Sequence, residues 1–148
     1  MSRPTKPATV RFYFDADVLG LAKTVVTLRS DVTYPGDPGG VLHRRERPAC
    51  PITSPATPDS TWIAEVAGRG WLIITRDRHI RDHRREIQAV RDHDAKMVTL
   101  AGDEAQGTWN QLEVLMCQWR AIEAQIIDAR GPFIYRATRT ALTRHDLN

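Results

Sequence analysis

The run Trp71-Leu72-Ile73-Ile74-Thr75 constrains the fold most, because its apolar residues do not alternate with polar ones. A strand with one solvated face alternates, whereas a strand buried on both faces in a parallel sheet is almost continuously apolar. Two further runs, Val10–Phe14 and Lys96–Leu100, also predict strands. Stretches with helical spacing separate the runs, which predicts helices packed on the sheet. We therefore predict an α/β fold, a three-layer α/β/α sandwich with a mostly parallel central sheet.

The remaining elements follow from the same patterns. Apolar residues at helical spacing predict four helices, over residues 18–29, 59–68, 80–92 and 105–128. We predict a short strand at Asp31–Tyr34 and an edge strand at Phe133–Arg136. The 148 residues suit one domain. We place this domain at residues 9–137, after a flexible lead-in at 1–8 and before a polar tail at 138–148.

The segment from Pro35 to Pro58 differs from the rest of the chain. It is rich in proline and glycine and has almost no apolar periodicity, which predicts a long loop. A connection of this length without regular structure is uncommon in a compact domain and is usually functional or disordered. Two readings remain open: a mobile flap over the functional site, or a tolerated surface insertion.

The composition narrows the class of protein. With 41% hydrophobic and 26% charged residues, the chain is typical of a soluble globular protein. No apolar run approaches the roughly 20 residues needed to cross a bilayer. The two cysteines, Cys50 and Cys117, lie far apart, so we expect no disulfide framework and a cytoplasmic location. The net charge of +3 suits a polyanionic partner.

Aspartates stand at the junctions of the predicted elements. Asp15 ends the first strand, with Asp17 two residues on; Asp77 follows the run 71–75, and Asp59 opens a helix. The carboxyl ends of parallel strands meet at one edge of a sheet, where open α/β folds bind their ligands. Carboxylates gathered there repel each other and need a cation, a shared proton or basic neighbours. Each aspartate also suits a helix N-cap, and because a carboxylate has two oxygens, both roles stay open.

Arginines surround Asp77 in the sequence. One group follows the apolar run, and a second basic patch spans His43–Arg47. The first group consists of Arg76, Arg78, Arg81, Arg84 and Arg85. Acids inside a basic frame suit a divalent cation with phosphates around it, because Mg²⁺ and Mn²⁺ prefer oxygen ligands. A solvated, arginine-rich helix face is the alternative reading.

Rival chemistries have weaker support in the sequence. His79 and His83 have the i, i+4 spacing of helical zinc ligands, but no cysteine lies nearby and the glutamate of a zinc-protease helix is absent. The chain has no G-x-S-x-G nucleophile elbow, and its glycines do not form a phosphate-binding loop between a strand and a helix.

Three segments carry a resemblance to a known family. They are Phe12–Asp17, Pro58–Ala67 and Gly70-Trp71-Leu72-Ile73-Ile74-Thr75-Arg76-Asp77, whose last part is similar to the family's apolar strand followed by T-R-D. In these segments and in Pro132–Arg136, the chain resembles the PIN-like nuclease superfamily, and within it small bacterial VapC-type toxins. The resemblance implies a PIN-like sandwich and hydrolysis of RNA phosphodiester bonds with Mg²⁺ or Mn²⁺.

The family's residues map onto this chain by motif. The resemblance implies that Asp15, Asp59 and Asp77 are catalytic and hold the metal, with Asp17 as a further ligand. We expect Arg76, Arg78 and Arg81 to bind the phosphates of the substrate. RNA, an antitoxin protein and a second copy of the chain are the partners that the likeness implies.

The chain departs from the family's pattern at two acids. The fourth acid has no clear match, although Asp82 is available, and the usual helix glutamate has no secure counterpart, since Glu65 lies well inside its helix. A non-catalytic module that binds nucleic acid or a partner protein is therefore the alternative to a ribonuclease. Hydrolysis of another phosphoester, such as DNA, is a third hypothesis.

Overall fold

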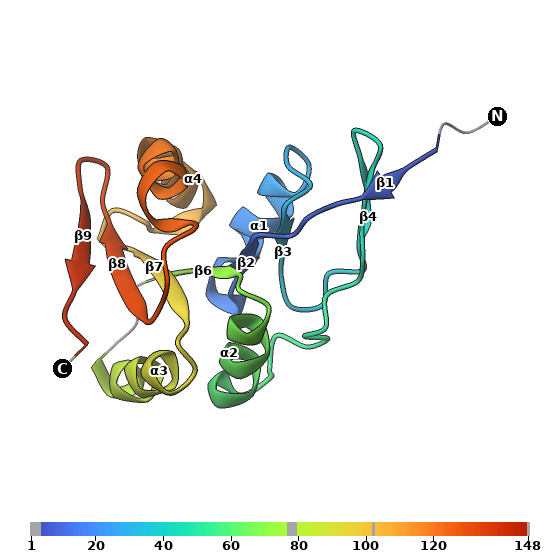
Figure 1. Cartoon of the computed structure of the whole chain (residues 1–148). Helices are drawn as coiled ribbons and strands as arrows, with labels where there is room; N and C mark the ends of the chain where they lie inside the picture. Colours follow the sequence, from blue (N-terminus) through green and yellow to red (C-terminus); the bar gives the residue numbers. More distant parts are fainter. Residues whose placement is uncertain (1–3, 77–79, 102, 148) are drawn as a thin grey trace.

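The computed structural model describes residues 4–76, 80–101 and 103–147, and for residues 80–83 it describes the backbone alone. Strands and helices alternate along the chain (Figure 1). The strands are β1 (Lys6–Pro7), β2 (Phe12–Phe14), β3 (Val32–Thr33), β4 (Gly40–Leu42), β5 (Arg45–Arg47), β6 (Leu72–Arg76), β7 (Lys96–Leu100), β8 (Phe133–Ala137) and β9 (Leu142–His145). The helices are η1 (Ala16–Val18), α1 (Leu19–Val25), α2 (Asp59–Gly68), α3 (Ile80–Asp92), α4 (Gly107–Ala121) and its π-helical continuation η2 (Ile122–Ile126).

The main sheet has six strands in the order β3-β2-β6-β7-β8-β9. Every neighbouring pair is parallel except β8 and β9, which are antiparallel. β6 and β7 lie inside the sheet, and the residues Leu72–Ile74 and Met97–Leu100 are buried. The prediction of a mostly parallel sheet built on continuous apolar runs is therefore confirmed.

Helices cover both faces of this sheet, so the predicted three-layer sandwich is also confirmed (Figure 1). Successive strand residues point to opposite faces. Phe12 and Phe14 accordingly belong to the core cluster that includes residues of α1 and α4. Tyr13, which lies between them, belongs to the cluster formed with α2 and α3 and stacks on Trp62 with ring centroids 5.2 Å apart. The end of β2 is thus fixed by aromatic packing from both sides.

The carboxyl-terminal part of the chain differs from the prediction. Phe133–Ala137 forms a strand, but β8 is not the edge of the sheet, because β9 pairs with it on the outer side. β9 arises within the predicted polar tail at residues 138–148. Its residues show little apolar pattern because an edge strand is held mainly by backbone pairing with one neighbour.

The predicted loop at 35–58 also contains regular structure. β4 and β5 pair as a hairpin with Leu42 opposite Arg45, so His43 and Arg44 form a two-residue turn. β1 adds to the hairpin in parallel, which makes a separate three-stranded sheet from part of the predicted lead-in at 1–8. The expectation of a loop without regular structure is therefore wrong for residues 40–47.

Within the described part of the chain, no helix combines the length and the apolar character that spanning a bilayer requires.

Candidate functional site at the carboxyl ends of the parallel strands

Asp15 lies directly after β2 and is 3% exposed. Its backbone N–H donates to the carbonyl oxygen of Ile74 in β6 at 2.9 Å, which holds the ends of the two strands together. One carboxylate oxygen, Oδ1, accepts a hydrogen bond from the N–H of Ala16 at 2.6 Å and so caps η1. The other oxygen, Oδ2, lies 3.5 Å from Oγ1 of Thr75. The cap predicted for Asp15 is present, and the second oxygen faces the end of β6.

Thr75 connects Asp15 to Asp17. Its Oγ1 lies 2.8 Å and 3.0 Å from the two carboxylate oxygens of Asp17, and the backbone N–H of Arg76 donates to Asp17 Oδ2 at 3.2 Å. A threonine hydroxyl has one proton to donate, so it cannot satisfy both carboxylates at once. The end of β6 therefore holds two acids next to one another around a single, almost fully buried hydroxyl.

Asp59 reaches this region from α2. Pro58 is the N-cap residue and Asp59 is the first residue of the helix, so the cap predicted for Asp59 is wrong by one position. Instead, Asp59 Oδ1 accepts a hydrogen bond from the indole N–H of Trp62 at 2.9 Å. Because Trp62 stacks on Tyr13, this hydrogen bond and the ring contact together connect the start of α2 to β2.

The charges of Asp15, Asp17 and Asp59 contribute to the raised pKa of the Tyr13 hydroxyl. The pKa of Tyr13 is raised well above its usual value, mainly by burial, then by the charges of Asp15, Cys50, Asp59 and Asp17. Charge effects of this kind fall off with distance. Asp15 and Asp17 follow Tyr13 directly in the chain, and Asp59 binds Trp62, which stacks on the Tyr13 ring, so acids from two parts of the chain lie around this residue. Tyr13 is neutral at physiological pH.

The predicted phosphate-binding arginines are only partly described. Arg76 is half-buried, and its Nε atom is buried with no hydrogen-bond partner among the described residues. Buried donors are almost always paired, so this atom suits an anionic ligand. Asp77 and Arg78 lie outside the described residues, as does the side chain of Arg81.

Comparison with protein families decides the classification. A family model described as PIN like domain matches residues 11–102, more than half of the chain. The chain belongs to the PIN-like domain family. Searches of curated proteins and of solved structures find no match. All four predicted acids, Asp15, Asp17, Asp59 and Asp77, fall inside the matched range.

PIN domains typically bind Mg²⁺ or Mn²⁺, ions that need oxygen donors. The described residues contain no group of three or more histidine, cysteine, aspartate or glutamate side chains placed to hold a metal ion. They do contain the pair formed by Asp15 and Asp17 around Thr75. Mg²⁺ is usually held by one or two carboxylates together with substrate phosphates and water. The pair in this PIN-like domain fits that requirement.

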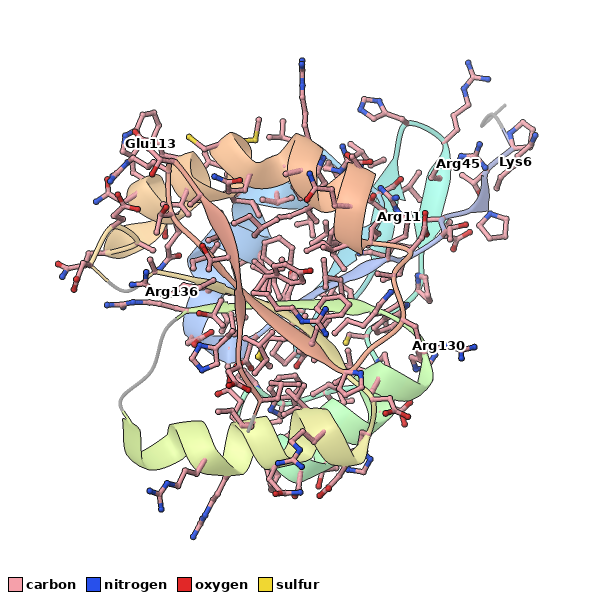
Figure 2. The ribbon with its side chains drawn as sticks, turned by 60° about the vertical axis from the view of Figure 1, so that its left-hand side comes forward. Lys6, Arg11, Arg45, Glu113, Arg130 and Arg136 are labelled. Atoms are coloured by element: carbon pink, nitrogen blue, oxygen red, sulfur yellow. The ribbon has the colours of Figure 1, made fainter. Side chains whose placement is uncertain are left out.

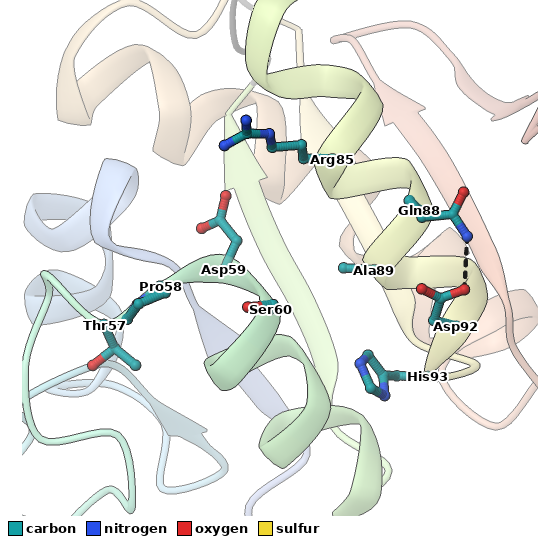
Figure 3. Close-up of a pocket in the computed structure, with 9 residues that line it drawn as sticks. All are labelled: Thr57, Pro58, Asp59, Ser60, Arg85, Gln88, Ala89, Asp92 and His93. Atoms are coloured by element: carbon teal, nitrogen blue, oxygen red, sulfur yellow. Dashed lines mark hydrogen bonds between the residues drawn. The ribbon is translucent and has the colours of Figure 1, made fainter.

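A hollow of about 580 Å³ lies beside Asp59, between the start of α2 and the side of α3 (Figure 3). Its lining residues are Thr57, Pro58, Asp59, Ser60, Arg85, Gln88, Ala89, Asp92 and His93. The side chains of Asp59 and Arg85 point toward one another across it. On the other side, the amide of Gln88 donates to Asp92 Oδ1 at 2.7 Å. The PIN-like domain thus has a polar recess that adjoins one of its acids.

Gln88, Asp92 and His93 were not among the predicted site residues. The signal for them is present, because positions 85, 88, 89 and 92 have the spacing of one helix face and Arg85 was noted among the arginines. Glu86, a buried carboxylate of α3, was also missed. Its burial depends on tertiary packing, which the local sequence does not reveal.

Proposed function

We propose that this PIN-like protein is a metal-dependent ribonuclease that hydrolyses RNA phosphodiester bonds. The observation that carries the proposal is the pair of carboxylates, Asp15 and Asp17, which follow β2 and lie beside the Thr75 hydroxyl near the end of β6. Each comes from the edge of the sheet where α/β folds bind ligands. The family membership supports the same reading, since PIN domains are generally nucleases.

The residues of the chain have distinct roles in this proposal. Asp15 and Asp17 hold Mg²⁺ or Mn²⁺, with Asp59 and Asp77 as further ligands. When bound, the ion supplies a Lewis acid that neutralises phosphate charge and activates water near neutral pH. The hydroxyl of Thr75 fixes the orientation of Asp17, and the Nε of Arg76, which has no hydrogen-bond partner among the described residues, binds a phosphate oxygen of the substrate.

We further propose that the protein acts as a VapC-type toxin. This role requires an antitoxin or a second copy of the chain as a partner. Trp109 and Met116 on α4 are exposed to 77% and 63%, and they provide apolar surface for such a contact. Light scattering of the purified protein tests the dimer: a monomer at all concentrations contradicts it.

The test of the nuclease proposal combines metal binding with RNA cleavage. We expect Asp15→Asn, Asp17→Asn and Asp77→Asn each to weaken Mn²⁺ binding, measured by calorimetry, and to abolish cleavage of labelled RNA. The matched control is Asp94→Asn, which makes the same chemical change just before β7, at the opposite edge of the sheet. Asp94 has φ 53°, which asparagine readily adopts. Unchanged cleavage by Asp77→Asn rejects its role, and a wild-type protein that binds no Mn²⁺ rejects the mechanism.

A non-catalytic, nucleic-acid-binding module is the second candidate. The observation in its favour is that the described residues hold a pair of acids rather than a group of three. This candidate predicts RNA binding that persists in chelator, without metal-dependent products. Parallel assays on labelled DNA separate both candidates from hydrolysis of another phosphoester.

A further inference from the structure

Four basic side chains gather on the small sheet formed by β1, β4 and β5. Lys6, His43, Arg44 and Arg45 line a second hollow of about 550 Å³ together with Pro4. All four are exposed, and within the described part of the chain none of them forms an ion pair. We call these four residues the hairpin platform. The positive charges of Lys6, Arg44 and Arg45 remain available to a partner.

The other two charged residues of β5, Glu46 and Arg47, bind partners within the protein. Arg47 is buried and binds Asp37 through Nε at 2.7 Å and Nη2 at 3.0 Å, so it is not part of the platform. Glu46 lies between Arg45 and Arg47, and strand residues alternate between faces. Its carboxylate accepts a hydrogen bond from the hydroxyl of Thr5 at 3.2 Å. The basic patch predicted at 43–47 is therefore reduced to residues 43–45, and β1 adds Lys6.

The platform lies away from Asp15 and Thr75. Figure 2 shows Lys6 and Arg45 on the same side of the molecule as Arg11 and Arg130, which precede β2 and β8. Arg136, near the carboxyl end of β8, lies on the opposite side. Asp15 and Thr75 mark the carboxyl ends of their strands. In this structure the basic centre of the predicted loop therefore does not cover Asp15 or Thr75, and the flap stays a prediction.

The backbone at the tip of the hairpin is unfavourable for the residues that occupy it. His43 and Arg44 have φ of 50° and 61°, in the left-handed region. A two-residue hairpin turn of this kind strongly prefers Asn-Gly, because side chains other than asparagine and aspartate fit this region poorly. Strained conformations that persist in a structure point to a function for the residues involved. Here the strain places two basic side chains at the tip.

We propose that the hairpin platform binds the phosphodiester backbone of RNA, at a site separate from the acids. The choice of RNA as the polyanion rests on the proposed function. Arginine binds phosphate through two parallel N–H groups, and lysine binds it as a point charge. Contacts to phosphates alone carry no sequence information, so the platform holds RNA of any sequence. A strand that reaches from the platform to the acid pair is thereby anchored at both edges of the sheet.

The experiment measures RNA binding in chelator, where cleavage does not occur, over a series of salt concentrations. The variant combines Lys6→Ala, Arg44→Gly and Arg45→Thr. Each phosphate contact contributes about 0.7 to the slope of log K against log salt for single strands. We expect the slope to fall by about 2, which corresponds to roughly hundredfold weaker binding at about 0.1 M salt. Glycine suits the turn, so loss of the hairpin does not explain the change.

The control removes the same charge elsewhere, with Lys23→Ala, Arg120→Ala and Arg144→Thr, all at exposed positions. We expect these to leave the slope nearly unchanged. Equal weakening by both triple variants, or none by the hairpin variant, overturns the proposal. Binding of the platform to phosphatidylserine vesicles but not to RNA also overturns it. Asp15→Asn separates the two proposals, because it should retain binding in chelator even where cleavage is lost.

Discussion

Removal of the Asp37 carboxylate should destabilise the protein strongly, because it leaves a buried arginine without its partner. Asp37 and Arg47 are 2% and 7% exposed. The two oxygens of Asp37 accept four hydrogen bonds: Nε and Nη2 of Arg47 at 2.7 Å and 3.0 Å, Thr33 Oγ1 at 2.9 Å and the N–H of Gly39 at 2.9 Å. Breaking a buried ion pair from one side costs about 3–5 kcal/mol. We expect Asp37→Ala to lower the free energy of unfolding by this amount.

Urea denaturation at neutral pH measures the effect. Glu65→Ala is the control, because Glu65 pairs with Arg69 on the exposed side of α2, and such pairs contribute about 0.3–0.5 kcal/mol. The double variant Asp37→Leu with Arg47→Met should recover most of the loss, since replacing a whole buried pair is often neutral. A loss of less than about 1 kcal/mol for Asp37→Ala would refute the reasoning, because it would mean that Arg47 finds other partners or reaches solvent.

Three further predictions concern the site, the turn and acid stability. Thr75→Val should weaken Mn²⁺ binding about tenfold, because the hydroxyl that orients the ligand Asp17 is lost. Calorimetry measures the affinity, and an unchanged value contradicts the role of the hydroxyl. His43→Asn with Arg44→Gly should raise the free energy of unfolding by about 1–2 kcal/mol, because it relieves two left-handed residues; a decrease in urea denaturation would show that these side chains stabilise the turn. Burial alone would raise the pKa of Asp31, but two bound arginines hold that pKa below its usual value of 3.8. The stabilisation by Asp31 is therefore complete above this value and is lost as the pH falls through the lower folded pKa, so unfolding below about pH 4 should be steeper in the wild type than in Asp31→Asn.

The main sheet could be predicted because burial specifies it locally. β6 and β7 are apolar on both faces, and such runs have few alternative structures in a folded domain. The small sheet could not be predicted in this way. Its strands are only two or three residues long and mostly exposed, and its turn, His43-Arg44, lacks the asparagine and glycine that signal a hairpin. β9 was missed for a related reason, since its pairing with β8 does not depend on an apolar pattern.

The aspartates of the candidate site could be named from the sequence, but their contacts could not. That acids from several strands meet at one edge stays a prediction, because Asp15 and Asp17, which lie around Thr75, both follow β2, and Asp77 lies outside the described residues. The contact of the Thr75 hydroxyl with Asp17 was not among the predictions. Which of several nearby acids a hydroxyl reaches depends on tertiary geometry. Strand alternation does not separate the exposed Arg45 from the buried Arg47, because residues two apart share a face; the pairing of Arg47 with Asp37 makes the difference.

The match to the PIN-like family ends at residue 102, but the sheet does not. β7 pairs with β8 over its whole length, from Lys96 opposite Phe133 to Leu100 opposite Ala137. A recombinant fragment cut at the family boundary would lose β8, β9 and α4 together. It would present β7 as a long, apolar, unpaired edge, which is a template for aggregation. Expression trials of this protein should therefore retain the residues through His145.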